Sequence, residues 1–189
     1  GNIVLAKDAF EHKKLTPFAI RLREGLAMMN GTSCMTGVGL VNLHYAEKLL
    51  NLSCLVSVTI NEILNAFDDH LSEALNEVKL HEGQNAVAKI MRELISESTL
   101  MRNRQEHLYV ETQETEFKEK VQEYYSLRCT PQILGPIYDT IKSAEHVLLN
   151  ELNSVSDNPV IDHHRRNVYH GGNFHGDYVA LEMDKVKIA

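Results

Sequence analysis

The feature that most constrains the fold is a long stretch, residues 38–67, in which apolar side chains recur nearly unbroken at helical spacing. It has no proline and, after Gly39, no glycine, the two residues that most often end a helix. Its apolar side chains recur at helical spacing, at Leu40, Leu43, Ala46, Leu50, Val56, Ile60, Ile63, Leu64 and Phe67. Residues 52–60 are β-branched enough to suit a strand, but the length of the whole run favours a helix. We therefore predict one long helix that is buried over much of its surface.

The rest of the chain also divides into helical segments separated by polar turns. We predict helices near residues 15–26, 69–80, 85–98, 131–152 and 178–189, with a break at 81–84. Pro131 suits the first turn of a helix. Residues 101–120 are charged and lack an apolar stripe, which predicts a mobile surface excursion, and residues 160–169 predict two short strands or an extended loop. The sum is an all-α chain, a bundle of long helices.

Composition and charge exclude several classes of protein. With 43% hydrophobic and 24% charged residues, the chain is globular rather than disordered. The net charge of -7 argues against nucleic-acid binding, and no apolar run is long enough to span a membrane. The three cysteines lack the Cys-x-x-Cys spacing of redox or zinc sites, which favours a reducing, cytoplasmic compartment.

Three polar motifs carry the functional signal. The densest is Gln-Glu-Tyr-Tyr-Ser-Leu-Arg at 122–128, because an arginine fork matches a carboxylate and a tyrosine can donate a proton near an anion. The others are Asn-Gly-Thr at 30–32 and Gly-Gly-Asn-Phe-His-Gly at 171–176. Taken singly, each has a structural reading as an interface network, a helix cap or a turn. The histidines at 163, 164, 170 and 175 lack metal-ligand spacing, so no metal is expected.

Together with a fourth stretch, these motifs resemble the aromatic amino acid ammonia-lyase family, which contains histidine, phenylalanine and tyrosine ammonia-lyases. The matching stretches, in order, are Glu-Gly-Leu-Ala-Met-Met-Asn-Gly-Thr at 24–32, Gln122 with Tyr-Ser-Leu-Arg-Cys at 125–129, Asn-Ser-Val-Ser-Asp-Asn-Pro at 153–159, and 171–176. The resemblance covers the chain from about residue 15 onward and is closest to the histidine enzymes. It implies a long-helix bundle in a homotetramer.

The resemblance also implies a chemistry, the removal of ammonia from an aromatic L-amino acid to give a trans-2-enoic acid such as urocanate. The family's electrophile is a methylidene-imidazolone made from an internal Ala-Ser-Gly, which this sequence does not contain. Both ends of the chain look cut. We therefore expect residues 1–189 to be one helical piece of the central lyase domain, without the electrophile-bearing N-terminal part and without the C-terminal part, and inactive by itself.

By resemblance, five residues of this chain belong to the site. Asn30 would hydrogen-bond near the electrophile and the substrate carboxylate, and Tyr125 would assist proton or amine handling. Arg128 would grip the carboxylate, Gln122 would orient the ring or substrate, and Phe174 would line the pocket. Glu123 departs from the pattern, since the family usually has Asp at that position.

The resemblance leaves the exact activity of the parent protein open. Histidine is the expected substrate, which would place the enzyme in histidine catabolism. An aminomutase of the same family, which returns ammonia to the β-carbon, is one alternative. A non-catalytic helical oligomerisation scaffold is another, although a scaffold has no need of a carboxylate fork beside a phenol.

Overall fold

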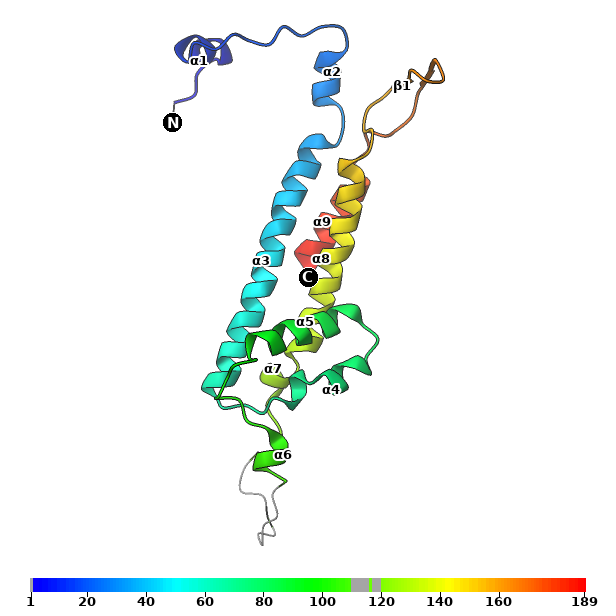
Figure 1. The fold of residues 1–189 in the computed structure, drawn as a ribbon. Coiled ribbons are helices and arrows are strands. Elements are labelled where there is room, and N and C mark those ends of the chain that lie inside the picture. Colours follow the sequence, from blue (N-terminus) through cyan, green and yellow to red (C-terminus); the bar gives the residue numbers. More distant parts are fainter. Residues whose placement is uncertain (1, 110–115, 117–119) are drawn as a thin grey trace. The chain divides into compact units, whose positions relative to one another are not determined.

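The computed structural model describes residues 2–109, 116 and 120–189, and within them the regular secondary structure is almost entirely helical. The helices are α1 (Ala6–His12), α2 (Glu24–Met29), α3 (Ser33–Ile63), η1 (Asp69–Leu71, a 3-10 helix), α4 (Glu73–Glu77), α5 (Glu82–Leu94), α6 (Arg104–His107), α7 (Tyr125–Arg128), α8 (Thr130–Leu152) and α9 (Asp177–Ile188) (Figure 1). A short hairpin, β1 (Val160–Asp162) and β2 (Asn167–Tyr169), completes them. The predicted all-α fold class is confirmed.

The described chain forms two compact units. Unit 1 comprises the residues up to 32 together with 155–175, and unit 2 comprises 33–154 together with 176–189. Unit 2 holds the long helices α3 and α8, which lie side by side with α9 against them (Figure 1). None of the helices in the described residues is long and apolar enough to cross a membrane.

The predicted long helix is confirmed as α3, although it begins before residue 38, at Ser33. Gly37 and Gly39 lie inside it, and Gly39 is useful there. A Cβ on Gly39 would lie 2.9 Å from the Leu148 side chain of α8 and 3.5 Å from Val179 of α9. The missing side chain therefore lets α8 and α9 approach α3 closely.

Helices α5 and α8 cross with their backbones in contact. A Cβ on Gly135 would lie 2.6 Å from the backbone nitrogen of Gln84, and a Cβ on Gly83 would lie 2.1 Å from the carbonyl oxygen of Gly135. Only two glycines can meet at such a distance. The predicted break at 81–84 is present but displaced: it lies between α4 and α5 at residues 78–81, and Gly83 and Gln84 belong to the first turn of α5.

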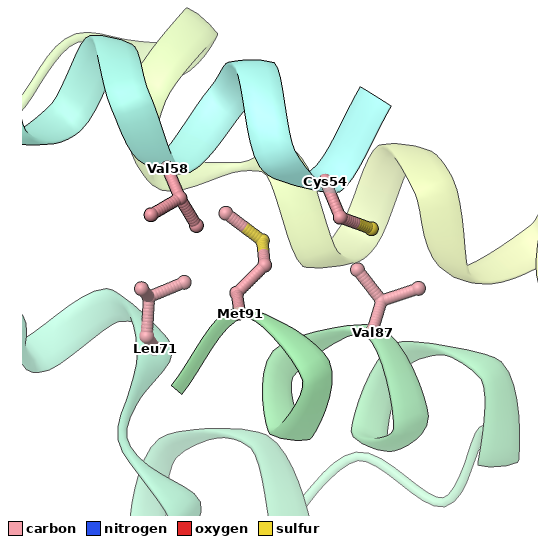
Figure 2. Close-up of a cluster of buried hydrophobic side chains, with 5 residues drawn as sticks. All are labelled: Cys54, Val58, Leu71, Val87 and Met91. Carbon is pink, nitrogen blue, oxygen red and sulfur yellow. The ribbon is translucent and has the colours of Figure 1, made fainter. Parts of the chain in front are cut away.

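Two apolar clusters fill the interior of unit 2. The first joins α3, η1 and α5 through Cys54, Val58, Leu71, Val87 and Met91, all at most 2% exposed (Figure 2). The second joins α3 and α8 through Leu43, Leu50, Ile141 and Ala144. Leu134 and Tyr138 of α8 pack against both clusters. The start of α8 is therefore part of the same packed interior as α3 and α5.

Other predicted boundaries need correction. The helix predicted over 69–80 is split, because Ser72 leaves the helical path and caps α4, accepting a hydrogen bond from the Leu75 N–H at 3.3 Å. Helix α8 does begin with Pro131 in its first turn, as predicted. In unit 1, residues 15–21 are not helical. Of the predicted surface excursion at 101–120, residues 110–115 and 117–119 lie outside the described residues.

In unit 1 the predicted strands form an antiparallel hairpin. Val160 pairs with Tyr169 and Asp162 with Asn167. The Asp162 carboxylate accepts hydrogen bonds from the His164 and Arg165 backbone N–H groups, both at 3.0 Å. These bonds, with one from the Arg165 side chain, lower the pKa of Asp162. The turn is therefore organised by one carboxylate.

Buried polar groups join η1 to its neighbours. The Gln84 side chain donates to the Asn76 side chain at 3.0 Å, and Asn76 donates to the His70 carbonyl at 3.2 Å. His70 is 5% exposed, and its Nε2 has no hydrogen-bond partner. Burial lowers the pKa of His70, against the opposing effect of the Asp69 and Glu123 carboxylates. The buried site therefore favours the neutral form of the imidazole.

The glycine contact makes a prediction about stability. Gly135→Ala should destabilise the protein by about 2 kcal/mol, because the new methyl group meets backbone rather than a side chain that can move. Gly37→Ala is the matched control: a Cβ there meets nothing within 4 Å, so it should be neutral or stabilising by about 0.5–1 kcal/mol. Chemical denaturation compares the two. Equal effects would contradict a backbone contact between α5 and α8.

The lowered pKa of His70 predicts a pH dependence of stability. Unfolded histidine takes up a proton near pH 6.5, whereas folded His70 does so only at lower pH. The unfolded state then binds more protons, so stability should fall as the pH drops below about 6.5. His70→Gln should make this fall shallower, while His163→Gln, at an exposed histidine, should not. The free energy of unfolding between about pH 7.5 and about pH 5.5 tests it, and identical pH slopes for the three proteins would refute it.

Candidate functional site

Unit 2 contains a cavity of about 330 Å³ at the segment that carries the densest polar motif. Its lining includes Asp69, His70, Arg104, Gln122, Arg128 and Gln132. Two of the predicted site residues, Gln122 and Arg128, thus face one cavity. Its walls come from η1, α4 and α6 and, from a distant part of the sequence, the segment that runs through α7 into the start of α8.

The third predicted residue of unit 2, Tyr125, lies beside Arg128. Both belong to the single turn α7, where residues three apart share a face. The Arg128 guanidinium lies 4.6 Å from the centre of the Tyr125 ring, within cation–π range. The Tyr125 side chain is 73% exposed, and the Nε of Arg128 is buried with no hydrogen-bond partner. A guanidinium fork with an accessible phenol next to it is suited to binding a carboxylate.

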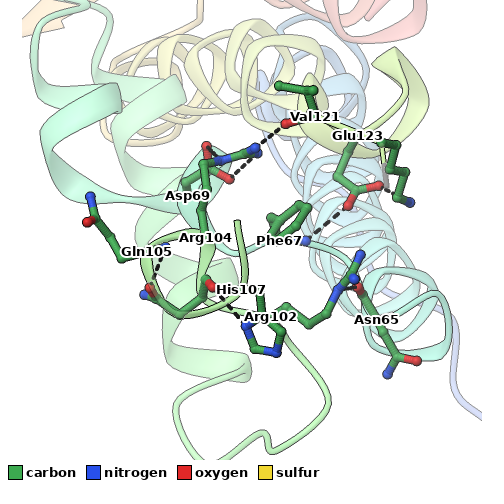
Figure 3. A network of polar contacts seen from close by, with 11 residues as sticks. Asn65, Phe67, Asp69, Arg102, Arg104, Gln105, His107, Val121 and Glu123 are labelled. Carbon is green, nitrogen blue, oxygen red and sulfur yellow. Dashed lines mark hydrogen bonds and ion pairs between the residues drawn. The ribbon is translucent and has the colours of Figure 1, made fainter. Parts of the chain in front are cut away.

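The residues ahead of α7 are held by a polar network that the sequence did not reveal (Figure 3). Glu123 is 3% exposed, and its Oε1 accepts a hydrogen bond from the Phe67 N–H at 3.1 Å. Arg104 donates to the Val121 carbonyl oxygen and pairs with Asp69. No sequence signal connects these residues, because they lie 17 to 56 positions apart and their spacing follows no period.

In unit 1 the turn at Asn30 depends on glycine. Gly31 has a φ of +134°, which side chains rarely adopt, and a Cβ there would lie 2.8 Å from the Ser156 carbonyl oxygen. Asn30 ends α2, its N–H donating to the Leu26 carbonyl at 2.7 Å. The Asn-Gly-Thr motif and the 153–159 stretch therefore meet at Gly31 and Ser156.

The glycine-rich motif meets the same stretch. Asn158 accepts a hydrogen bond from the Gly171 N–H at 2.9 Å, and Asn173 donates to the Val155 carbonyl at 3.1 Å. Arg23 adds an ion pair with Asp157 at 3.3 Å. The Asn-Gly-Thr motif and two stretches more than 100 positions later in the chain are thus joined inside unit 1. Several of their polar residues, Asn158 and Asn173 among them, hold this junction together.

The five predicted site residues fall into two groups. Gln122, Tyr125 and Arg128 lie in unit 2, and Asn30 and Phe174 lie in unit 1, where Phe174 is 39% exposed. The catalytic and substrate-binding roles given to them stay predictions. Within residues 2–109, 116 and 120–189, no group of three or more His, Cys, Asp or Glu side chains is arranged to hold a metal ion.

Comparison with known proteins gives consistent results. A family model described as "Aromatic amino acid lyase" matches residues 1–189. The tyrosine 2,3-aminomutase of Myxococcus sp. (strain Mx-B0) is 40% identical over 189 residues, which cover 96% of this chain and 36% of that protein. The histidine ammonia-lyase of Caldanaerobacter subterraneus subsp. tengcongensis is 34% identical, with 100% of this chain and 35% of that protein covered.

Solved structures agree with these relatives. The phenylalanine aminomutase of Pantoea agglomerans superimposes with a TM-score of 0.85 at 35% identity, over 96% of this chain and 36% of that one. The chain thus spans about a third of the length of the relatives it matches. Because the family model covers every residue and the helices superimpose closely, the chain belongs to the aromatic amino acid lyase family.

Proposed function

We propose that the protein carrying this chain is a carbon–nitrogen lyase that acts on an aromatic L-amino acid, and that this chain supplies its carboxylate-binding part. The observation that carries the proposal is the Arg128 guanidinium beside the exposed Tyr125 ring at the cavity lined by Gln122. Membership of a family of ammonia-lyases and aminomutases supports it.

Each residue has a role that its chemistry allows. Arg128 binds the substrate carboxylate through two parallel hydrogen bonds, since its planar fork matches the two oxygens. Tyr125 holds or moves a proton at its phenolic oxygen next to that anion. Gln122 donates and accepts through its amide to orient the substrate. Asn30 and Phe174 contribute an amide and an apolar wall.

The family's methylidene-imidazolone would supply an electrophile that activates the substrate for loss of ammonia. This sequence lacks the Ala-Ser-Gly from which the group forms, so another part of the protein has to provide it. The residues present suit such a neighbour, because the Tyr125 ring is 73% exposed and available to a group from outside unit 2. Within this chain, the task is to bind and orient the carboxylate.

We propose that this chain is part of a longer protein that assembles into a homotetramer. Residues 1–189 would be the central piece of a longer cytoplasmic enzyme, with the electrophile before it and a further helical part after it. Helix α3 exposes large apolar side chains, among them Tyr45 at 59%, Leu49 at 63% and Ile63 at 71%. Faces of this kind favour association with other helices, which supports the homotetramer expected from the resemblance.

Two candidate reactions differ in what becomes of the ammonia. The Ser-Leu-Arg-Cys sequence at 126–129, which resembles that of the histidine enzymes, favours a histidine ammonia-lyase that makes urocanate. The 40% identity to the tyrosine 2,3-aminomutase of Myxococcus favours an aminomutase that acts on tyrosine. An aminomutase retains the ammonia and delivers a β-amino acid.

Product analysis separates the candidates. The full-length protein is incubated with L-histidine, L-tyrosine and L-phenylalanine, and the conjugated acid is followed by ultraviolet absorbance while β-amino acids are measured by chromatography. A conjugated acid from one substrate identifies a lyase, and a β-amino acid identifies an aminomutase. The 189-residue chain, tested in parallel, should release no ammonia. If the full-length protein gives neither product, the proposed lyase and aminomutase activities on these three amino acids are refuted, and an unusual substrate or a scaffold is favoured instead.

Substitutions at α7 test the assigned roles. Arg128→Ala should raise KM by about tenfold to a hundredfold, because one charged hydrogen-bonding partner of the carboxylate is lost. Tyr125→Phe should lower kcat by about a hundredfold or more, because the proton-carrying oxygen is lost.

The neighbouring tyrosine gives a matched control for this test. Tyr124 is 74% exposed and Tyr125 is 73% exposed, so Tyr124→Phe removes the same oxygen at the same exposure. It should leave kcat within about twofold of the wild type, since Tyr124 lies outside the pair with Arg128. Equal losses at 124 and 125 would refute the role given to Tyr125.

A further inference from the structure

The segment that carries the candidate site is fastened at two points, one on each side of Gln122. On one side, the Val121 carbonyl oxygen accepts a hydrogen bond from Arg104. On the other, the Glu123 carboxylate accepts one from the Phe67 N–H at 3.1 Å. Figure 3 shows both contacts. A residue between two fastened neighbours has little freedom to move, and Tyr125 and Arg128 follow within six positions.

Arg104 is itself held firmly. It forms two hydrogen bonds with Asp69, from Nε at 3.1 Å and from Nη2 at 3.0 Å. The guanidinium also lies 4.4 Å from the centre of the fully buried Phe67 ring. The hydrogen bond with Asp69 raises the pKa of Arg104, so the cation persists at all working pH values. The contact with Val121 therefore comes from a preorganised donor.

Glu123 is held equally firmly from the other direction. Its carboxylate is almost fully buried, and Lys120 pairs with the oxygen that Phe67 leaves free. A buried carboxylate of this kind needs both partners. Phe67 supports both fastenings. Its ring stacks with the Arg104 guanidinium, and its N–H donates to the Glu123 carboxylate.

We propose that Arg104 and Glu123, which lie in the wall of the cavity, are positioning residues that set the place of Gln122, Tyr125 and Arg128. The proposal rests on the proposed function for its effect on catalysis, but the fastening itself is a property of this chain. Small displacements of binding groups can cost about a hundredfold in rate. The fastening therefore matters for activity although neither residue is assigned a contact with the substrate.

Arg102 provides a matched control for Arg104. Its guanidinium lies at the same 4.4 Å from the Phe67 ring, but its Nε donates to the Asn65 carbonyl at 2.6 Å. Lysine keeps the charge at either position and loses the planar fork. Arg104→Lys and Arg102→Lys therefore share the loss of stacking on Phe67, and only Arg104→Lys also alters the contacts with Asp69 and Val121. Glu123→Gln keeps an oxygen acceptor for the Phe67 N–H, whereas Glu123→Ala does not.

The experiment measures backbone hydrogen exchange and steady-state kinetics on the same full-length variants. In Arg104→Lys, amides of residues 121–129 should exchange about tenfold faster or more than in the wild type, and kcat/KM should fall by about tenfold or more. Arg102→Lys should match the wild type within about threefold in both. Glu123→Ala should behave like Arg104→Lys, with Glu123→Gln closer to the wild type.

Backbone hydrogen exchange tests whether Arg104 and Glu123 fasten residues 121–129, independently of catalysis. If the wild type turns over none of the aromatic amino acids, the proposed function fails, and the exchange of residues 121–129 still tests the fastening. Wild-type exchange in Arg104→Lys, or equal effects in Arg104→Lys and Arg102→Lys, would overturn the proposal. Lost activity with unchanged exchange would also overturn it, because Arg104 would then act other than by positioning.

Discussion

The backbone contact between α5 and α8 is the constraint on which the candidate site of unit 2 depends. Gly83 and Gly135 let the two helices meet with no side chain between them, and this fixes the first two turns of α8. Helix α7, with Tyr125 and Arg128, ends immediately before α8 begins. The place of the guanidinium is therefore set by helix packing at one end and by the network around Phe67 at the other.

This arrangement separates rigid support from chemistry. Asp69 and Arg104 pair with each other, and Arg104 and Glu123 bind backbone groups, so these residues hold the segment. Arg128 retains a buried Nε without a partner, and Tyr125 stays exposed. Groups that bind a ligand have to keep some of their hydrogen-bonding capacity unused inside the fold, and in this segment those groups are the ones on α7.

Much of the fold follows from the sequence because helices leave a local pattern. The long helix around Leu43 and Leu50 and the helix that starts at Pro131 were predictable from spacing alone. The close approach of Gly83 to Gly135 was not, because it depends on a partner 52 positions away. Gly83 in a polar stretch predicted a break in the helix, whereas packing against α8 makes it part of α5.

The candidate site, like the fold, could be predicted from the sequence only in part. The resemblance could name Gln122, Tyr125 and Arg128, since they lie in one short motif. It could not indicate that Arg104 and Glu123 fasten that motif, because long-range hydrogen bonds leave no period in a sequence. Gly31 is an intermediate case: its motif was visible, but the reason for glycine, the approach of Ser156, required the fold.

The most direct test of the account is a structure of the full-length protein with the trans-2-enoic acid related to its substrate. The account predicts that both carboxylate oxygens lie within hydrogen-bonding distance of the Arg128 guanidinium, with the Tyr125 ring beside them. A carboxylate bound elsewhere, with Arg128 turned away from it, would contradict the account.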